Sequence, residues 1–368
     1  MTNEKPIAIS FFTGAGGLDM GFAQAGFDIK LCVEIEEKYC LTLIENHPTW
    51  NVKCADIQDY DKKLIYKEAG LGKEQEVDVI IGGSPCQSFS TAGKRQAFED
   101  PRGRAMLKYA EIIQEVKPKV FVLENVRGLL SAALKHRKMK ERGEGFPPLT
   151  EEEKSGSALK HLLGKFEDYN ITKKLVNSAM YGVPQKRERV FIIGIRKDLN
   201  KTFNFPEPTH NKNGDNNKQK WVSVENVFKD LNDNIKKHDY VEYSPERLKY
   251  MKMIPEGGGN WRDLPENLVK EAMGGAYNSG GGKVGFYRRI KIDEPAPTLL
   301  TSPMQKSTNL GHPFEDRPLS IQEYMAIQGF PLDYELQGSL NDKYAQVGNA
   351  VPVKLSYVIG SSIYDLLK

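Results

Sequence analysis

The sequence of 368 residues has few cysteines, little net charge and no long hydrophobic run. None of the four cysteines belongs to a Cys-x-x-Cys motif, which argues against a zinc site or a disulfide framework and fits a reducing compartment. No apolar stretch approaches the roughly 18 residues of a membrane span, so we expect a cytoplasmic protein without a membrane partner. A net charge of +3 permits a nucleic-acid partner, but a local basic patch would have to bind it.

Apolar runs alternate with glycine turns and helical periodicity, which predicts an α/β fold. Residues 7–12 form the first predicted strand, and Leu18, Phe22 and Ala25 then recur at helical spacing until Gly26. Further buried strands are predicted at residues 29–33, 77–81, 120–123, 171–176 and 190–195. Helices are predicted through residues 106–116, 321–327 and 353–367, with a turn at 346–352 before the last of them.

The glycine-rich turn at residues 12–17 follows the first strand. It lacks the dinucleotide pattern G-x-G-x-x-G, because Asp19 stands where the last glycine should be, and it suits a nucleoside without a pyrophosphate. Glu34 lies 20 positions after Gly14, where a carboxylate can reach ribose hydroxyls, and Asp56 could accept a hydrogen bond from an exocyclic amine. Each carboxylate taken alone could equally be a solvated loop residue.

Cys86 lies in the Gly/Pro turn of residues 82–90, directly after the predicted strand 77–81. Reacting groups collect at the carboxyl edge of open α/β sheets, and a partly exposed thiol there can act as a nucleophile. A structural cysteine in a tight loop is the alternative. Glu124 ends the strand at 120–123, so we expect it to share one cleft with Cys86.

Several polar stretches lie between these elements. Residues 87–103 suggest a mobile lid, and the charged residues 134–158 suggest an exposed, partly flexible insertion. Gln185, Arg187 and Arg189 lie at period two and should point to one face, unless the run is simply a solvated surface. A loop-rich segment from about 205 to 312 carries a strip of basic and aromatic residues at 283–291 that either contacts nucleic acid or forms an ordinary exposed hairpin.

Together these stretches resemble the DNA (cytosine-5) methyltransferases, in the family's motif order from Ile7 to the carboxyl terminus. The matching stretches are residues 12–17, Glu34, Asp56-Ile57, 83–87, 124–126, 185–189, 317–319 with Glu323, and 348–352. The resemblance implies a Rossmann-like, S-adenosylmethionine-dependent methyltransferase fold with a smaller loop-rich target-recognition domain. The implied domains are a catalytic domain at 1–204, target recognition at 205–315 and a return to the catalytic domain at 316–368. Ile35 departs from the family, in which some members have an aromatic residue.

The resemblance assigns roles to residues. Those implied in catalysis are Cys86, Glu124, Asn125, Arg187 and Arg189. Those implied in holding S-adenosylmethionine are Phe12, Thr13, Gly14, Gly16, Gly17, Glu34, Ile35, Asp56, Ile57, Pro85, Asn349 and Val351. Those expected at the DNA are Gln87, Ser90, Lys94, Arg95, Arg288 and Arg289. The sequence offers no metal ligand set, and no metal is expected.

The implied reaction is methyl transfer from S-adenosylmethionine to C5 of a flipped-out cytosine in a specific duplex DNA sequence, through a bond from Cys86 to C6. A tRNA cytosine-5 methyltransferase is one alternative, although the Cys-Phe-Thr tripeptide of that branch is absent. A non-catalytic DNA-binding paralogue is another, although the chain keeps Cys86, Glu124 and both arginines. A nicotinamide dehydrogenase is disfavoured by Asp19. We expect a monomer of bacterial or phage origin, and a cognate restriction endonuclease would be a separate partner.

Overall fold

The computed structural model describes residues 5–85, 98, 100–234, 238–280 and 283–368, and the chain divides into two compact units. Unit 1 comprises Met1–Asn177, Glu188–Glu207 and Leu355–Lys368, and unit 2 comprises Ser178–Arg187 and Pro208–Lys354. The main segment of unit 2 starts close to the predicted domain boundary at 205. It runs to Lys354, and the predicted functional division at 315 stays a prediction.

The described residues of unit 1 form a seven-stranded sheet in the order β3-β2-β1-β4-β5-β8-β6. Its strands are β1 (Ile7–Phe11), β2 (Asp28–Glu34), β3 (Val52–Cys54), β4 (Val79–Gly83), β5 (Val120–Val126), β6 (Tyr169–Asn177) and β8 (Glu188–Arg196). The first five strands are parallel, whereas β8 runs antiparallel to both of its neighbours, β5 and β6. The predicted α/β fold is therefore confirmed, and the carboxyl ends of the parallel strands meet at one edge.

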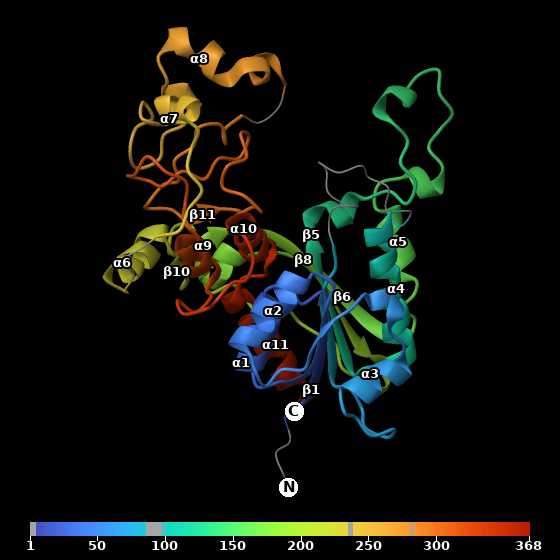
Figure 1. Ribbon diagram of the computed structural model, residues 1–368. Helices are drawn as coiled ribbons and strands as arrows, with labels where there is room; N and C mark the ends of the chain where they lie inside the picture. The colour runs from blue at the N-terminus through green and yellow to red at the C-terminus, as the bar shows by residue number, and fades with distance from the viewer. Residues whose placement is uncertain (1–4, 86–97, 99, 235–237, 281–282) are drawn as a thin grey trace. The chain divides into compact units, whose positions relative to one another are not determined.

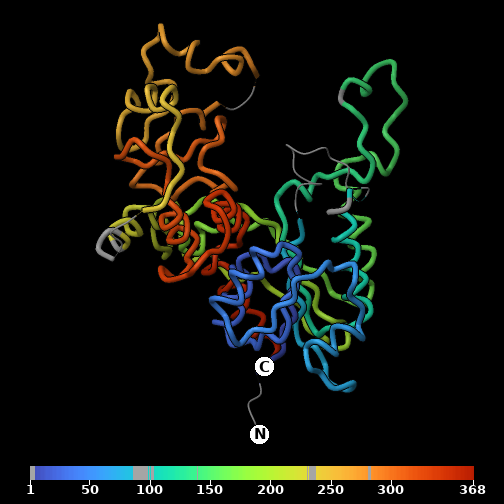
Figure 2. Tube along the Cα trace, in the orientation of Figure 1, coloured from blue at the N-terminus to red at the C-terminus, as the bar shows by residue number. Residues whose placement is uncertain are grey.

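Helices cover both faces of this sheet (Figure 1). One face carries α1 (Gly17–Gln24), α2 (Glu37–Asn46) and α11 (Val353–Leu367), and the other carries α3 (Lys62–Glu68), α4 (Pro101–Val116) and α5 (Ser157–Leu163). Figure 2 shows the C-terminal segment beside the N-terminal part of the chain. The two meet closely at Gly21, where a Cβ atom would lie 2.4 Å from the Cβ of Ser356, so only glycine allows α11 to pack here.

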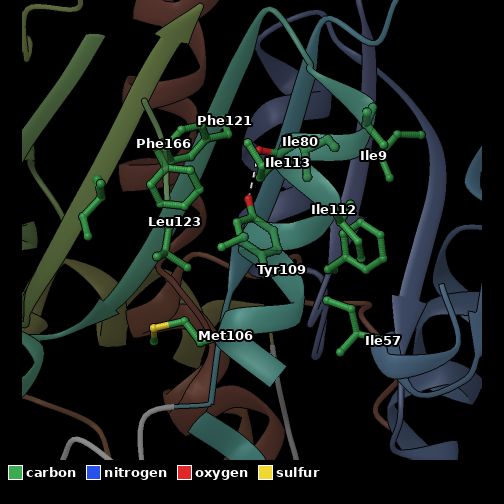
Figure 3. Packing of buried hydrophobic residues seen from close by; sticks show 14 of the residues in the cluster. Ile9, Ile57, Ile80, Met106, Tyr109, Ile112, Ile113, Phe121, Leu123 and Phe166 are labelled. Atoms are coloured by element: carbon green, nitrogen blue, oxygen red, sulfur yellow. Dashed lines mark hydrogen bonds between the residues drawn. The ribbon is translucent and has the colours of Figure 1, made fainter. Parts of the chain in front are cut away.

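The core of unit 1 lies between the sheet and α4 (Figure 3). Tyr109 points from α4 into this core and is fully buried. Its hydroxyl donates to the carbonyls of Val122 at 2.8 Å and Ile80 at 3.1 Å, so its polar atom has partners on β5 and β4. This bond pair ties α4 to the two strands that end at the candidate site.

Unit 2 has short strands and many loops, as predicted. Strand β7 (Gln185–Lys186) pairs with β11 (Ala296–Pro297), and β9 (His210–Asn211) pairs with β10 (Gln219–Lys220). Its helices are α6 (Val224–Asn234), α7 (Pro245–Met251), α8 (Glu266–Met273), α9 (Ile321–Gln328) and α10 (Leu340–Asn349). A buried ion pair joins Arg317 to Glu323 in the first turn of α9, with N···O distances of 2.8 and 3.0 Å.

Two local predictions need correction. Helix α4 begins at Pro101, so residues 101–103 belong to this helix rather than to the predicted lid, whose residues 87–97 and 99 lie outside the described ranges. Helix α10 continues to Asn349, so the first half of the predicted turn at 346–352 is helical. The insertion at 134–158 is largely exposed, as predicted, and it has internal contacts. Arg137 donates to both oxygens of Glu153, at 2.8 and 2.6 Å.

Within the described ranges, no helix combines the length and the apolar character that crossing a bilayer requires.

Candidate active site

The carboxyl edge of the sheet brings the ends of β4 and β5 together. Gly83 pairs with Glu124 in the parallel ladder, and Ser84 and Pro85 continue from β4 toward Cys86. Cys86 itself lies outside the described residues, as do Gln87, Ser90, Lys94 and Arg95. The predicted neighbours of the thiol can therefore be examined, whereas the position of the thiol stays a prediction.

Glu124 and Arg189 form an ion pair at this edge. Arg189 Nε lies 2.9 Å from Glu124 Oε1, and the Glu124 residue is only 7% exposed. The antiparallel register of β8 places Arg189 opposite Val126, two residues beyond Glu124 on β5. A charge-assisted bond in a poorly solvated place is strong and fixes both groups. The remaining oxygen of Glu124 faces Gly83, where a Cβ atom would come within 3.1 Å of Oε2.

Asn125 connects β5 to the turn that leads to Cys86. Its amide nitrogen donates to Ser84 Oγ at 2.9 Å and to the Ser84 carbonyl at 3.1 Å. Its amide oxygen accepts from the Val126 backbone N–H at 2.9 Å, and the residue is buried. Because both ends of the amide are engaged, Asn125 braces the turn, and its assignment as catalytic stays a prediction.

The β1–α1 turn and the end of β2 form a second polar cluster in unit 1. The backbone N–H of Gly14 donates to Glu34 Oε2 at 2.7 Å, while Oε1 accepts from the N–H groups of Ile35 and Glu36. Gly14 and Gly16 have φ values of +61° and +83°, which residues other than glycine rarely adopt. Burial raises the pKa of Glu34, and these backbone hydrogen bonds oppose that increase.

The other residues predicted near a nucleoside divide into two groups. Ile35 is 59% exposed and follows Glu34 directly, so its side chain is free to pack against a ligand. Asp56 is half-buried and accepts from the Gln58 N–H at 2.9 Å. The side chains of Thr13 and Ile57 are buried, and Ile57 belongs to the core cluster, so it can offer a ligand little besides its backbone. Gly17 begins α1, and Phe12 is half-buried.

Asp19 is a buried carboxyl group to which sequence reasoning gave no role. It lies in the first turn of α1 and is fully buried. Burial raises its pKa to about 7, the Ser10 hydroxyl opposes this change, and the carboxylate of Glu34 adds to it. The signal was present in the sequence, because Asp19 replaces a glycine of the dinucleotide pattern.

We expect Asp19 to make folding stability dependent on pH. Its pKa is near 3.9 in the unfolded chain and about 7 in the folded one, so between these values only the folded chain binds the proton. The stabilisation from proton binding at Asp19 is complete below the pKa of the unfolded chain, and it is lost as pH rises through the pKa of the folded chain. Relative to Asp19→Asn, the free energy of unfolding of the wild type should fall by roughly 1 kcal/mol per pH unit between pH 5 and 7.

Urea denaturation at pH 5, 6, 7 and 8 measures this difference. The asparagine side chain has nearly the same shape and stays neutral, so it removes only the titration. If the free energies of unfolding of the two proteins changed in parallel with pH, the pKa of Asp19 in the folded chain would be close to its usual value, and the prediction would be wrong.

Unit 2 holds the remaining predicted site residues. Arg187 is fully buried, and its guanidinium donates to the carbonyls of Leu299 at 2.9 Å, Gly348 at 2.8 Å and Asn349 at 3.1 Å. These contacts hold the segment that precedes Val351, so Arg187 supports the Asn349 motif. Its assignment as catalytic, like those of Asn349 and Val351 as cofactor ligands, stays a prediction.

The two adjacent arginines expected at the DNA differ from each other. Arg289 is only 2% exposed and donates to the carbonyls of Met251, Ile254 and His312, which corrects its prediction as a DNA contact. A guanidinium with this burial and these partners stabilises the fold. Arg288 is half-buried and donates through Nε to the Asn309 carbonyl, so its role at DNA stays a prediction.

The described residues contain no group of three or more His, Cys, Asp or Glu side chains that could hold a metal ion.

The fold is similar to that of solved methyltransferases. The Entamoeba histolytica methyltransferase EhMeth matches with a TM-score of 0.62 over all of both chains, at 15% identity, a likeness that concerns the fold alone. Its match and the order of the seven-stranded sheet define the class of this chain as a Rossmann-like α/β methyltransferase fold.

Sequence comparisons define the family more closely. A family model described as C-5 cytosine-specific DNA methylase matches residues 7–365. The chain is 40% identical over 362 residues to the Type II methyltransferase M.Sau96I of Staphylococcus aureus, which covers 97% of this chain and 75% of that protein. It is also 40% identical over 365 residues to M.PspPI of Psychrobacter sp. (strain TA137), covering 98% and 79%. The chain belongs to the C-5 cytosine-specific DNA methylases, and its enzyme class is DNA (cytosine-5-)-methyltransferase.

Proposed function

We propose that this enzyme transfers a methyl group from S-adenosylmethionine to C5 of a cytosine flipped out of duplex DNA, within one specific sequence. The observation that carries the proposal is the Glu124–Arg189 pair at the carboxyl edge of the sheet. Asn125 links the same strand end to Ser84, two residues before Cys86. A carboxyl group, a guanidinium and a thiol near one base are the groups that cytosine activation requires.

The residues near β1 and β2 fit the adenosine part of S-adenosylmethionine. Of the three backbone hydrogen bonds to Glu34, Oε2 accepts only one, which leaves that oxygen acceptor capacity for a ribose hydroxyl. The exposed side chain of Ile35 supplies an apolar surface for adenine. When bound, the cofactor supplies an electrophilic methyl group on a sulfonium.

The chain's own residues activate the cytosine. C5 is too weak a nucleophile by itself, so the thiolate of Cys86 adds to C6 and forms a C–S bond, which makes C5 enamine-like. The electron pair displaced by this addition reaches N3 and O2. Glu124 holds a proton at N3, and the guanidinium of Arg189 stabilises the charge at O2. C5 gains the methyl group and S-adenosylhomocysteine is the other product. The C5 proton then passes to solvent, its electron pair re-forms the C5–C6 double bond, the C–S bond breaks with its pair returning to the Cys86 sulfur, and the proton at N3 returns to Glu124.

The target base must leave the DNA helix for this chemistry. The thiolate of Cys86 has to approach C6 from above the plane of the ring, and in a stacked cytosine the neighbouring bases occupy that space. Flipping costs about a few kcal/mol, which DNA contacts elsewhere on the enzyme must offset. Choice of sequence falls to unit 2, where the described residues are loop-rich. A cognate restriction endonuclease and a monomeric state stay predictions.

Bisulfite sequencing of DNA from a host that expresses the protein tests the function and identifies the target. We expect unconverted cytosines at one position of one recurring sequence, and none in the same host with an empty vector. Full conversion in a host that contains the folded protein would contradict the proposal. Incubation of the purified enzyme with tRNA and labelled cofactor tests the tRNA alternative, since labelled tRNA with unlabelled duplex DNA would favour it.

A further inference from the structure

Residues 257–263 of unit 2 form a turn that presents an arginine no motif singled out. Arg262 is exposed on the short helix η8 (Trp261–Asp263), and the centre of its guanidinium lies 5.0 Å from the centroid of the Trp261 ring. The indole in turn packs against the core cluster of Tyr250, Ile254 and Leu264. The arginine therefore lies on an aromatic surface that is anchored in unit 2.

The backbone of this turn is held from several directions. The Asn260 side chain accepts from the Arg262 N–H at 3.1 Å, and the Asp263 carboxylate accepts from the Asn260 N–H at 2.8 Å. The backbone N–H of Trp261 donates to the Phe286 carbonyl at 3.1 Å, and the backbone N–H of Arg289 donates to the Gly259 carbonyl at 2.9 Å. The guanidinium of Arg289 is buried and donates to the carbonyls of Met251 and Ile254, so the segment whose backbone holds the turn is itself fixed in unit 2.

The glycines before Arg262 permit this close packing. Gly258 has φ +137°, and a Cβ atom there would come within 2.5 Å of the Lys291 side chain. A Cβ atom on Gly259 would lie 2.7 Å from Pro255. These glycines therefore fit the turn against its neighbours.

Arg262 also differs from the other arginines of this part of the chain: within the described part of residues 238–316, Arg247, Arg288 and Arg289 all donate to protein acceptors, whereas no hydrogen bond or ion pair of the Arg262 side chain is found. Lys249 lies over Tyr250 but is paired with Glu271 at 3.3 Å. Helices α7 and α8, which flank the turn in the chain, lie side by side in unit 2 (Figure 1).

We propose that Arg262, oriented by Trp261 and the capped turn, reads a guanine in the major groove of the target sequence. This inference rests on the proposed function and names one residue that determines its specificity. A planar guanidinium has paired N–H donors that match O6 and N7 of guanine, and a lysine ammonium lacks this fork. The stacking on indole limits the rotamers of the side chain before DNA binds, so less conformational freedom is lost on binding.

The test compares methylation of duplexes in which each base pair of the wild-type recognition sequence is replaced in turn. We expect Arg262→Ala to relax discrimination at one G·C pair by about 5- to 150-fold in the ratio of kcat/KM values, with the other positions unchanged. Arg262→Lys keeps the charge and should relax the same position. Lys252→Ala, which removes one exposed charge nearby, is the matched control and should leave discrimination as in the wild type.

The contrary outcomes are distinct. Uniform weakening across all duplexes, with Arg262→Lys restoring the wild-type rate, would assign Arg262 to a phosphate and overturn the inference. Unchanged discrimination in Arg262→Ala would overturn it as well. Both outcomes leave the proposed function intact, whereas absence of DNA methylation by the wild type would be a failure of the proposed function. Thermal unfolding of each variant checks that the exposed substitution leaves the fold unchanged.

Discussion

Replacing Cys86 by alanine is expected to abolish methyl transfer. The loss should exceed the roughly 10²- to 10⁴-fold effect of removing a general acid, because without the sulfur no bond to C6 forms and C5 is never activated. Binding of S-adenosylmethionine, measured by isothermal titration calorimetry, should change little, since the groups proposed to hold it lie near β1 and β2. The measurement is the rate of label transfer to a duplex that contains the recognition sequence.

A second cysteine provides the control for this experiment. Cys54 is exposed at the end of β3, and Cys54→Ser should keep nearly the full rate. Substantial turnover by Cys86→Ala would remove the covalent step from the mechanism. If both variants lost activity and cofactor binding together, the loss would reflect folding, and the assignment of Cys86 would have to be made by other means.

Replacing Glu124 by glutamine should lower kcat by about 10²- to 10⁴-fold. The amide keeps the shape of the side chain and can still accept a hydrogen bond from Arg189, but it cannot hold an acidic proton at N3 of cytosine. Because the change acts on the intermediate rather than on DNA binding, KM for the duplex should stay within a few-fold of the wild-type value. Steady-state kinetics on the same duplex gives both quantities.

Glu188 provides a matched control on β8. Its carboxylate forms an exposed ion pair with Arg127 at 3.1 Å, and such pairs contribute little. Glu188→Gln should therefore leave kcat unchanged. An unaltered rate in Glu124→Gln would exclude the carboxyl group from proton transfer at N3, and Glu124 would then serve only to hold Arg189.

The sheet was largely predictable because buried parallel strands appear in sequence as short apolar runs. The runs at 7–12, 29–33 and 120–123 each lie in a strand. The place of β8 between β5 and β6 could not be derived from these runs, since nothing in an apolar run specifies its neighbours or its direction. That order was expected only from the resemblance to methyltransferases.

The candidate site was predictable where strand ends carry polar residues. Glu124 lies at the carboxyl edge of the sheet, as its place after an apolar run predicts, and it forms an ion pair with Arg189 that no pattern in the sequence indicated. Gln185 and Arg187 lie at period two, and both bind the backbone of Leu299 in unit 2. A common face for these two residues and Arg189 stays a prediction.

Residues that look alike in sequence differ in how deeply the fold buries them and in which groups they contact. Arg288 and Arg289 are adjacent and equally basic, yet only Arg289 is enclosed by main-chain carbonyls. Asp19 and Glu34 are both acidic residues near the glycine turn, but Glu34 accepts three backbone hydrogen bonds, whereas burial dominates at Asp19 and raises its pKa to about 7. Composition gives the charge of a segment, and only the fold shows which charges solvent can reach.

The most direct test of the central claim uses duplex DNA with 5-fluorocytosine at the target position. Fluorine at C5 cannot leave as a proton does, so the wild-type enzyme with S-adenosylmethionine should remain covalently bound to the DNA, and peptide mass spectrometry should locate the adduct on Cys86. Cys86→Ala should give no adduct. Normal methylation of unmodified duplex by the wild type, with no adduct on the fluorinated one, would contradict the proposed sulfur–carbon bond.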